Sequence, residues 1–246
     1  MKKQPLNDVQ KQAVEAVGNP VLIFAGAGSG KTRVLTHKIA YLIENELFSP
    51  EEILAVTFTN KAAEEMTKRV CELLKNKETC LAVGTFHSIC ARLLRKEIHR
   101  LGFSQDFAIY DVQDQLALIK LVMDNMNVAR TFVDPKTVSN NISYFKNKLE
   151  DSSEAAKSAK TVIERTIADI YKNYQKELKK NNALDFDDLL LFPLVLFDKY
   201  PDVLKKYQEK WKYVLVDEYQ DTNRPQFLFI YAIASEHKQI SEIGRA

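Results

Sequence analysis

The stretch Ala25-Gly26-Ala27-Gly28-Ser29-Gly30-Lys31-Thr32 decides the fold, because it joins an apolar run at 21–24 to a helical pattern that starts near Val34. A strand, a glycine-rich turn and a helix in this order are the context of a phosphate-binding loop. Glycines let backbone N–H groups turn inward around a phosphate, and the helix N-terminus adds partial positive charge. One departure from the strict pattern is Ala25, which stands where the first glycine is usual. The stretch predicts a nucleoside triphosphate site.

Two side chains of this loop have predicted chemical roles. Lys31 reaches the β- and γ-phosphates in such a loop, and the hydroxyl of Thr32 is a ligand for Mg²⁺. The ligands that we expect from these residues are therefore a nucleoside triphosphate and Mg²⁺; the resemblance described below implies that the triphosphate is ATP.

Further apolar runs at 53–58, 81–85 and 212–216 each read as a strand, and helical patterns separate the first runs. Only seven glycines occur, and three of them lie in the loop, so an all-β fold with many tight turns is disfavoured. Alternating strands and helices predict an α/β fold in which a mostly parallel sheet carries helices on both faces. Residues 1–87 and 211–246 supply this pattern.

Residues 88–210 read as a mainly helical insertion into the α/β domain. Asp134-Pro135 predicts a helix start, and Asp185 can cap another helix that Pro193 should bend or end. The segment 149–160 is charged and rich in small residues, which indicates an exposed connection.

An acidic pair, Asp217-Glu218, follows the apolar run at 212–216. Ligands of open α/β sheets bind at the carboxyl ends of the strands, so both side chains are expected near the phosphate loop. There Asp217 is a candidate Mg²⁺ ligand, while Glu218 can orient and deprotonate the water that attacks the γ-phosphate. We predict Glu218 and Lys31 as catalytic residues, with Thr32 and Asp217 at the metal.

Composition and charge exclude several classes of protein. The chain of 246 residues is 46% hydrophobic and 28% charged, with a formal net charge of +2 that neither supports nor excludes nucleic-acid binding. Cys71, Cys80 and Cys90 lack the spacing of a zinc site and indicate a reducing compartment. Neither a leader pattern nor a long apolar span is evident. We expect a cytoplasmic protein without a membrane partner.

Taken together, the motifs resemble the N-terminal portion of a superfamily 1A DNA helicase of the UvrD/PcrA/Rep type. Six segments carry this resemblance, in the family's order, over almost the whole chain: LNDVQ at 6–10, AGAGSGKTRVLTHKIAYL at 25–42, AVTFTNKAAEEM at 55–66, VGTFHSICARLLR at 83–95, ALDFDDLL at 183–190 and VLVDEYQDTNRPQ at 214–226.

The resemblance implies further site residues. Gln10 is expected to recognise the adenine edge, and Arg33 to lie near the nucleotide. Single-stranded DNA is expected to contact two segments: Phe58, Thr59, Asn60 and Lys61, and Thr85, Phe86 and His87. Aromatic faces stack on bases while hydroxyl, amide and ammonium groups hold phosphates, although ordinary core packing is the alternative for Phe58 and Phe86. Asp185-Phe186 resembles a further DNA-facing motif, but a helix cap with a core phenylalanine explains it nearly as well.

The resemblance also implies an organisation and an activity. Residues 1–87 and 211–246 correspond to the RecA-like (P-loop NTPase) motor domain 1A, and 88–210 to the inserted subdomain 1B. The sequence at 241–246 matches neither the strand nor the motif that follows in the family, so we expect the second motor domain, 2A with 2B, to be missing.

The expected function is ATP-driven translocation on single strands and unwinding at single/double-strand junctions, with 3′–5′ polarity, in DNA repair or replication. The fragment alone is expected to bind ATP weakly and to be poorly active. A subunit of an AddA/RecB-like helicase–nuclease, or a truncated nucleotide-dependent DNA-binding module, are the alternatives.

Overall fold

The structure, a computed structural model, describes residues 5–26, 28–75 and 81–245, which form two compact units. The first unit contains the described residues up to Ile89, together with Tyr200–Thr222 and those from Gln226 onward. The second contains Cys90–Lys199 and Asn223–Pro225. The division of domains expected at residues 87 and 210 stays a prediction.

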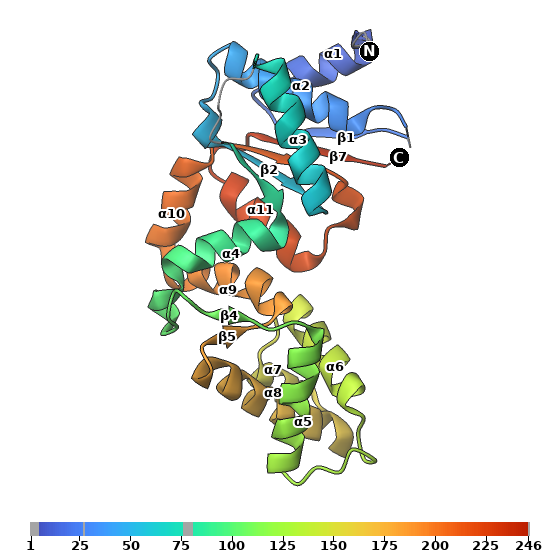
Figure 1. The fold of residues 1–246 in the computed structure, drawn as a ribbon, viewed down its shortest axis with the longest axis vertical. Coiled ribbons are helices and arrows are strands. Elements are labelled where there is room, and N and C mark those ends of the chain that lie inside the picture. Colours follow the sequence, from blue (N-terminus) through green and yellow to red (C-terminus); the bar gives the residue numbers. More distant parts are fainter. Residues whose placement is uncertain (1–4, 27, 76–80, 246) are drawn as a thin grey trace. The chain divides into compact units, whose positions relative to one another are not determined.

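A five-stranded parallel sheet is the centre of the first unit, in the order β1-β7-β6-β2-β3 (Figure 1). Its strands are β1 (Val21–Phe24), β2 (Ile53–Thr57), β3 (Ala82–Thr85), β6 (Tyr213–Val216) and β7 (Ile240–Gly244). The two central strands β2 and β6 are buried along their whole length, as expected for parallel strands covered on both faces. The predicted α/β fold with a parallel sheet is confirmed.

Helices cover both faces of this sheet. On one face α1 (Asp8–Glu15), α2 (Lys31–Glu44) and α3 (Asn60–Leu73) share a core with β2, β6 and β7. On the other face α11 (Arg224–Ala234) lies against Ile240 and Glu242 of β7, whose side chains alternate with Ser241 and Ile243 of the first face. Also in this unit are α10 (Pro201–Lys210), the first residues of α4 (Phe86–Glu97), and the 3₁₀ turns η1 (Pro50–Glu52) and η3 (Tyr219–Asp221).

Strand β7 corrects one expectation from the sequence. Residues 241–246 were expected to match no strand of the family pattern, yet Ile240–Gly244 form a strand between β1 and β6. The apolar side chain of Ile243 enters the core, and Ser241 is accommodated there because its hydroxyl bonds to the hydroxyl of Tyr213, with 2.8 Å between the oxygens. A polar residue in a strand is tolerated when its hydrogen bond is made.

The second unit is mainly helical, as predicted. Its elements are η2 (Ile98–Leu101), β4 (Ala108–Ile109), α5 (Val112–Asn125), α6 (Pro135–Lys148), α7 (Ser152–Ser158), α8 (Val162–Lys180), β5 (Ala183–Leu184) and α9 (Phe186–Lys199). Helices α5, α6, α7 and α8 enclose one apolar core. The expected start at Asp134-Pro135 is confirmed, because the Asp134 carboxylate accepts bonds from the N–H groups of Lys136 and Thr137.

Two expectations for this unit need correction. The connection expected at 149–160 contains helix α7, whose N-cap Asp151 and N3 residue Glu154 form a capping box. Of the two effects expected of Pro193, bending or ending the helix, the ending is wrong, because α9 continues to Lys199. Proline lacks one N–H but leaves the following turns free to form when the buried apolar face continues, as it does through Leu196 and Phe197.

Candidate functional site

The predicted phosphate loop lies between β1 and α2, at the carboxyl end of the sheet. Gly28 and Gly30 have φ values of 74° and 85°, a left-handed conformation that side chains disfavour, and Gly30 is the N-cap of α2. Among the described residues no side chain caps this helix. Its first N–H groups therefore remain to bind an anion. Ala27, also predicted in this site, lies outside the described residues.

Gln10 contacts the loop directly. Its Nε2 donates to the carbonyl oxygen of Ser29 at 2.9 Å, and its Oε1 accepts from the N–H of Asn7 at 3.1 Å in the capping box of α1. The capping pattern therefore holds the glutamine amide beside the phosphate loop. Its predicted contact with adenine stays a prediction.

The predicted catalytic and metal residues converge between α2 and the end of β6. Nζ of Lys31, a buried side chain, lies 3.7 Å from Oε1 of Glu218, whose side chain is 31% exposed. The side chain of Thr32 is close enough to the carboxylate of Asp217 to lower the pKa of that carboxyl. Residues 187 (218 − 31) and 185 (217 − 32) positions apart thus meet because β6 lies within the same parallel sheet as β1.

Asp217 lies in an electrostatically unfavourable place. Burial raises the pKa of its carboxyl above the usual range and the charge of Glu218 raises it further, while Lys31 and Thr32 act in the opposite direction. A cation placed beside the two carboxylates would relieve this repulsion. The oxygen donors of Thr32 and Asp217 fit Mg²⁺, which takes one or two carboxylates and completes its shell with water and phosphate oxygens. Among the described residues there is no cluster of three or more His, Cys, Asp or Glu for a metal held by protein alone.

The conformation of Glu218 is unusual for a residue with a side chain. Its φ is 50° and its ψ is 45°, in the left-handed region, and strain of this kind is concentrated at functional sites. Gln220 fixes its carboxylate, donating from Nε2 to Oε2 of Glu218 at 2.7 Å and accepting from the N–H of Arg245 at 2.9 Å. Nε of Arg245 lies 3.8 Å from the same Oε2. Gln220 was not singled out from the sequence, although its place two residues after Glu218 was a usable signal.

Two predicted residues flank the phosphate loop. The N–H of Ala25 donates to the carbonyl oxygen of Gly244 at 3.0 Å and continues the β1–β7 ladder. Arg33 is half-buried in the first turn of α2, and its carbonyl oxygen accepts a bond from the Thr36 hydroxyl. Neither observation tests their predicted nucleotide contacts.

The two predicted DNA segments lie side by side. They follow β2 and β3, which are adjacent strands with Thr57 opposite Thr85. Thr59 and Thr85 both act as helix caps, because their hydroxyls accept bonds from the N–H groups of Ala62 and Ser88. The exposed side chains of Asn60 and Lys61 begin α3, and His87 is half-buried in the first turn of α4.

The two aromatic residues of these segments differ in exposure. Phe86 is 2% exposed, and its ring lies edge-on to that of Phe58 with 6.1 Å between centroids. Phe58 is only partly buried. Of this pair Phe58 is thus the ring with surface for a base, supported from behind by Phe86, while DNA binding by either stays a prediction.

The second unit contains a closed ionic cluster that the sequence did not reveal. Nζ of Lys146 lies 2.5 Å from Asp185 and 2.8 Å from Asp188, and all three side chains are buried. Asp185 and Asp188 also accept each other's backbone N–H groups, so the predicted cap at Asp185 is confirmed. The neighbouring Phe186 is 46% exposed, so the core-phenylalanine interpretation is wrong.

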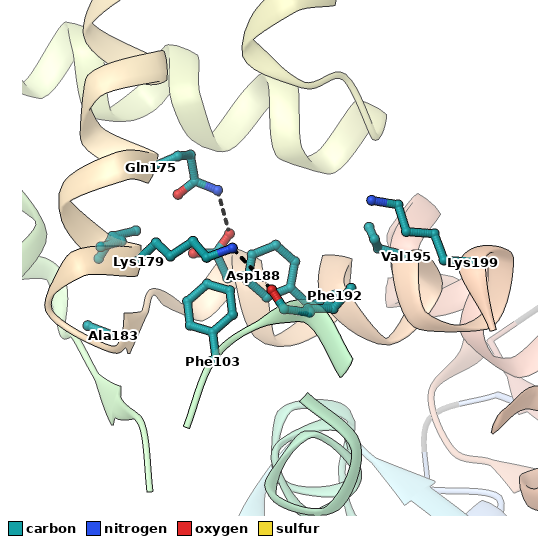
Figure 2. Close-up of a pocket in the computed structure, with 10 residues that line it drawn as sticks. Phe103, Gln175, Lys179, Ala183, Asp188, Phe192, Val195 and Lys199 are labelled. Carbon is teal, nitrogen blue, oxygen red and sulfur yellow. Dashed lines mark hydrogen bonds between the residues drawn. The ribbon is translucent and has the colours of Figure 1, made fainter. Parts of the chain in front are cut away.

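A pocket of about 230 Å³ opens beside this cluster (Figure 2). The rings of Phe103 and Phe192 form part of its wall, with 5.5 Å between centroids. At its floor the Gln175 amide donates to Oδ1 of Asp188 at 3.1 Å, and Lys179 donates to the carbonyl oxygen of Leu101 at 3.1 Å. These polar groups are already paired within the unit, which favours a structural role.

Comparison with known proteins agrees with the geometry of the first unit. Residues 6–245 match the family model for the UvrD/REP helicase N-terminal domain. The ATP-dependent DNA helicase PcrA of Bacillus subtilis is 45% identical over 239 residues, which cover 97% of this chain and 32% of the relative. PcrA of Staphylococcus aureus strain Mu50 is 44% identical, and PcrA of Staphylococcus epidermidis 43% identical, each with 97% of this chain and 33% of the relative covered.

The chain thus spans about a third of the length of these curated relatives. No helix within the described residues is both long and apolar enough to cross a membrane. The family match extends over nearly the whole sequence, and the sheet is the RecA-like one that the resemblance implied. The chain therefore belongs to the UvrD/REP helicase family.

Proposed function

We propose that this chain is the N-terminal motor segment of an ATP-dependent DNA helicase. The observation that carries the proposal is the convergence of Lys31, Thr32, Asp217 and Glu218 at one sheet edge. In phosphoryl transfer the protein mainly positions the reactants and stabilises charge, and these four residues provide a cation for the phosphates, oxygen ligands for a metal and a base for water.

Each residue then has a defined role at the triphosphate. Lys31 leaves Glu218 and binds the β- and γ-phosphates, while the loop N–H groups hold the phosphate oxygens. Glu218, released from Lys31, orients the attacking water and accepts its proton. Thr32 and Asp217 hold Mg²⁺, which when bound neutralises phosphate charge.

DNA is proposed to bind the same sheet edge. The segments 58–61 and 85–87 follow β2 and β3, which lie next to β6 and its Asp217-Glu218. Exposed Asn60 and Lys61 can hold phosphates while Phe58 stacks on a base. A movement of β6 or β2 on ATP hydrolysis would therefore change the contacts of the protein with both the nucleotide and the DNA.

The remaining parts of the proposal rest on the family. For the organisation, these parts are a motor domain 1A at 1–87 and 211–246, an inserted domain 1B at 88–210, and a second motor domain 2A/2B that completes the ATP site. For the activity, they are 3′–5′ unwinding at single/double-strand junctions, in DNA repair or replication. A cytoplasmic location agrees with the described cysteines Cys71 and Cys90, which are not in disulfides. The isolated 246-residue chain is proposed to hydrolyse ATP poorly, because residues of the second motor domain are needed.

Substitution of Glu218 tests the catalytic assignment. In the full-length protein Glu218→Gln should keep ATP binding and reduce DNA-stimulated hydrolysis by about 10²-fold or more, since a general base contributes about 10²–10⁴. Glu209→Gln, in the exposed part of α10, is the control and should leave turnover unchanged. Turnover that survives Glu218→Gln would remove Glu218 from the mechanism.

A further inference from the structure

Lys38 is a fully buried cation for which the proposed chemistry has no use. Its side chain is 0% exposed in the middle of α2. Among the described residues it pairs with no carboxylate, and its Nζ donates instead to three backbone carbonyl oxygens, those of Ala13 at 2.9 Å, Val14 at 3.5 Å and Ala16 at 2.5 Å.

These three oxygens belong to the C-terminal end of α1. The last carbonyls of a helix have no partner within it and carry the negative end of the helix dipole, so a cation is favourable there. The last turn of α1 contains no basic residue of its own. Lys38 therefore supplies, from α2, the cap that α1 lacks.

The other end of α1 is bonded to the phosphate loop. Gln10 is the third residue of the helix and donates to the carbonyl oxygen of Ser29 at 2.9 Å. A Cβ atom added to Gly30 would lie 3.3 Å from Nε2 of Gln10, so the two are closely packed. An eight-residue helix is about 12 Å long, and α1 is thus held at both ends by the loop and its helix.

The burial of Lys38 has a cost that an apolar residue would avoid. Removal from water lowers the pKa of Lys38 to about 8. A methionine would fill nearly the same space without this desolvation. The distinctive contribution of the lysine is thus its bonds to α1.

We infer that Lys38 is a positioning residue that fixes α1 along α2, and thereby holds the Gln10 amide where it reads the nucleotide base. The inference rests on the proposed ATP site. Lys31 and Lys38 lie seven residues, or two helical turns, apart on one face of α2. One helix therefore contains both the lysine that contacts the phosphates and the lysine that positions Gln10 for the base.

The test is the affinity of the chain for Mg-ATP and for Mg-GTP, measured by isothermal titration calorimetry. Lys38→Met should weaken ATP binding about five- to tenfold, the worth of one hydrogen bond from Gln10, and change GTP binding less than twofold. Gln10→Ala should reproduce this change, and the double variant should add little to it. Lys38→Arg should keep the preference for ATP, as should Lys11→Met on the exposed side of α1.

Other outcomes separate the inference from the proposed function. If Lys31→Ala leaves the binding of both triphosphates intact, the proposed ATP site itself is wrong. The role of Lys38 is overturned if Lys31→Ala weakens the binding of ATP and GTP equally but Lys38→Met leaves the ratio of the ATP affinity to the GTP affinity unchanged. It is also overturned if Lys38→Met lowers the two affinities by the same factor. A parent chain without preference for ATP overturns it as well.

Loss of folding in Lys38→Met is covered by a milder variant. Lys38→Gln retains one polar group in the cavity but is too short to reach all three carbonyls. It should lower the ratio of the ATP affinity to the GTP affinity about two- to fivefold. It should also speed the hydrogen exchange of the α1 amides relative to those of β6. An unchanged ratio in a folded Lys38→Gln chain contradicts the inference.

Discussion

Two clusters in this molecule contain the same kinds of side chain, one lysine and two carboxylates, but differ in how tightly they are closed. In the first unit Lys31 lies 3.7 Å from Glu218, whose side chain is 31% exposed. In the second unit Lys146 lies 2.5 Å and 2.8 Å from two carboxylates that are almost completely buried. Residue types alone therefore do not distinguish a functional cluster from a structural one.

The carboxylates of both clusters accept hydrogen bonds, so the difference lies in their burial and in the groups beside them. Around Lys146 the phenol of Tyr174 donates to Asp185 at 3.0 Å and the amide of Gln175 donates to Asp188 at 3.1 Å, so the carboxylates are satisfied. Around Lys31 the adjacent helix N-terminus has no side-chain cap among the described residues. The open cluster is suited to exchange its contacts for a ligand, and the closed one to hold helices together.

The largest expected effect follows from breaking the closed cluster. Lys146→Met leaves two buried carboxylates without their cation, which costs about 3–5 kcal/mol of unfolding free energy. Urea denaturation followed by circular dichroism measures this loss. Lys148→Met, two residues away but exposed, is the matched control and should change stability by less than about 0.5 kcal/mol. Equal stabilities of the two variants would show that the buried cluster does not support the fold.

A second prediction concerns the pH dependence of the closed cluster. Burial and the charge of Asp185 raise the pKa of Asp188 to about 7. When the pKa of a carboxyl is higher in the folded than in the unfolded protein, the protonated carboxyl stabilises the fold. This contribution is complete below the pKa of the unfolded chain, about 3.9, and is lost as the pH rises through the pKa of the folded protein. The contribution of Asp188 should thus fall from pH 5 to pH 8, by at most about 1.4 kcal/mol per pH unit.

Asp185 does not cancel this trend. The charge of Lys146 holds the pKa of Asp185 below its usual range despite burial, so its contribution is lost only on acidification below that range. Hydrogen exchange of the α8 and α9 amides between pH 5 and pH 8, corrected for intrinsic rates, measures the slope. Asp188→Asn should abolish it; a slope that persists in this variant assigns the titration to another group.

The comparison also explains what the sequence could and could not predict. The placement of the glycine-rich turn after β1 and of Asp217-Glu218 after β6 was predictable, because in each case a strand followed by a turn has a chemical requirement of its own. The Asp185 cap was predictable for the same reason. Lys146 was not, because its partners lie 39 and 42 residues away (185 − 146 and 188 − 146) and nothing local marks a buried ion pair.

The misses in the fold have similar causes. Strand β7 has polar residues at Ser241 and Glu242, so its sequence gives a weak strand signal, and its pairing with β1 and β6 is not visible locally. In the sequence Lys38 resembles any charged residue of an amphipathic helix, because its hydrogen bonds to the end of α1 join residues that are far apart in the chain. Helix α7, by contrast, had a readable capping box at Asp151 and Glu154 that the small, charged composition obscured.

We propose that the open cluster around Lys31 binds a nucleotide, whereas the closed cluster around Lys146 holds helices together. Titration of Mg-ATP into the 246-residue chain and its Lys31→Ala variant, with unfolding followed on the same samples, tests it most directly. We expect Lys31→Ala to weaken Mg-ATP binding about tenfold or more, since one hydrogen bond from a charged group is lost, while the free energy of unfolding changes by less than about 1 kcal/mol. Equal affinities of the two proteins, or a loss of binding that merely follows a loss of folding, would contradict it.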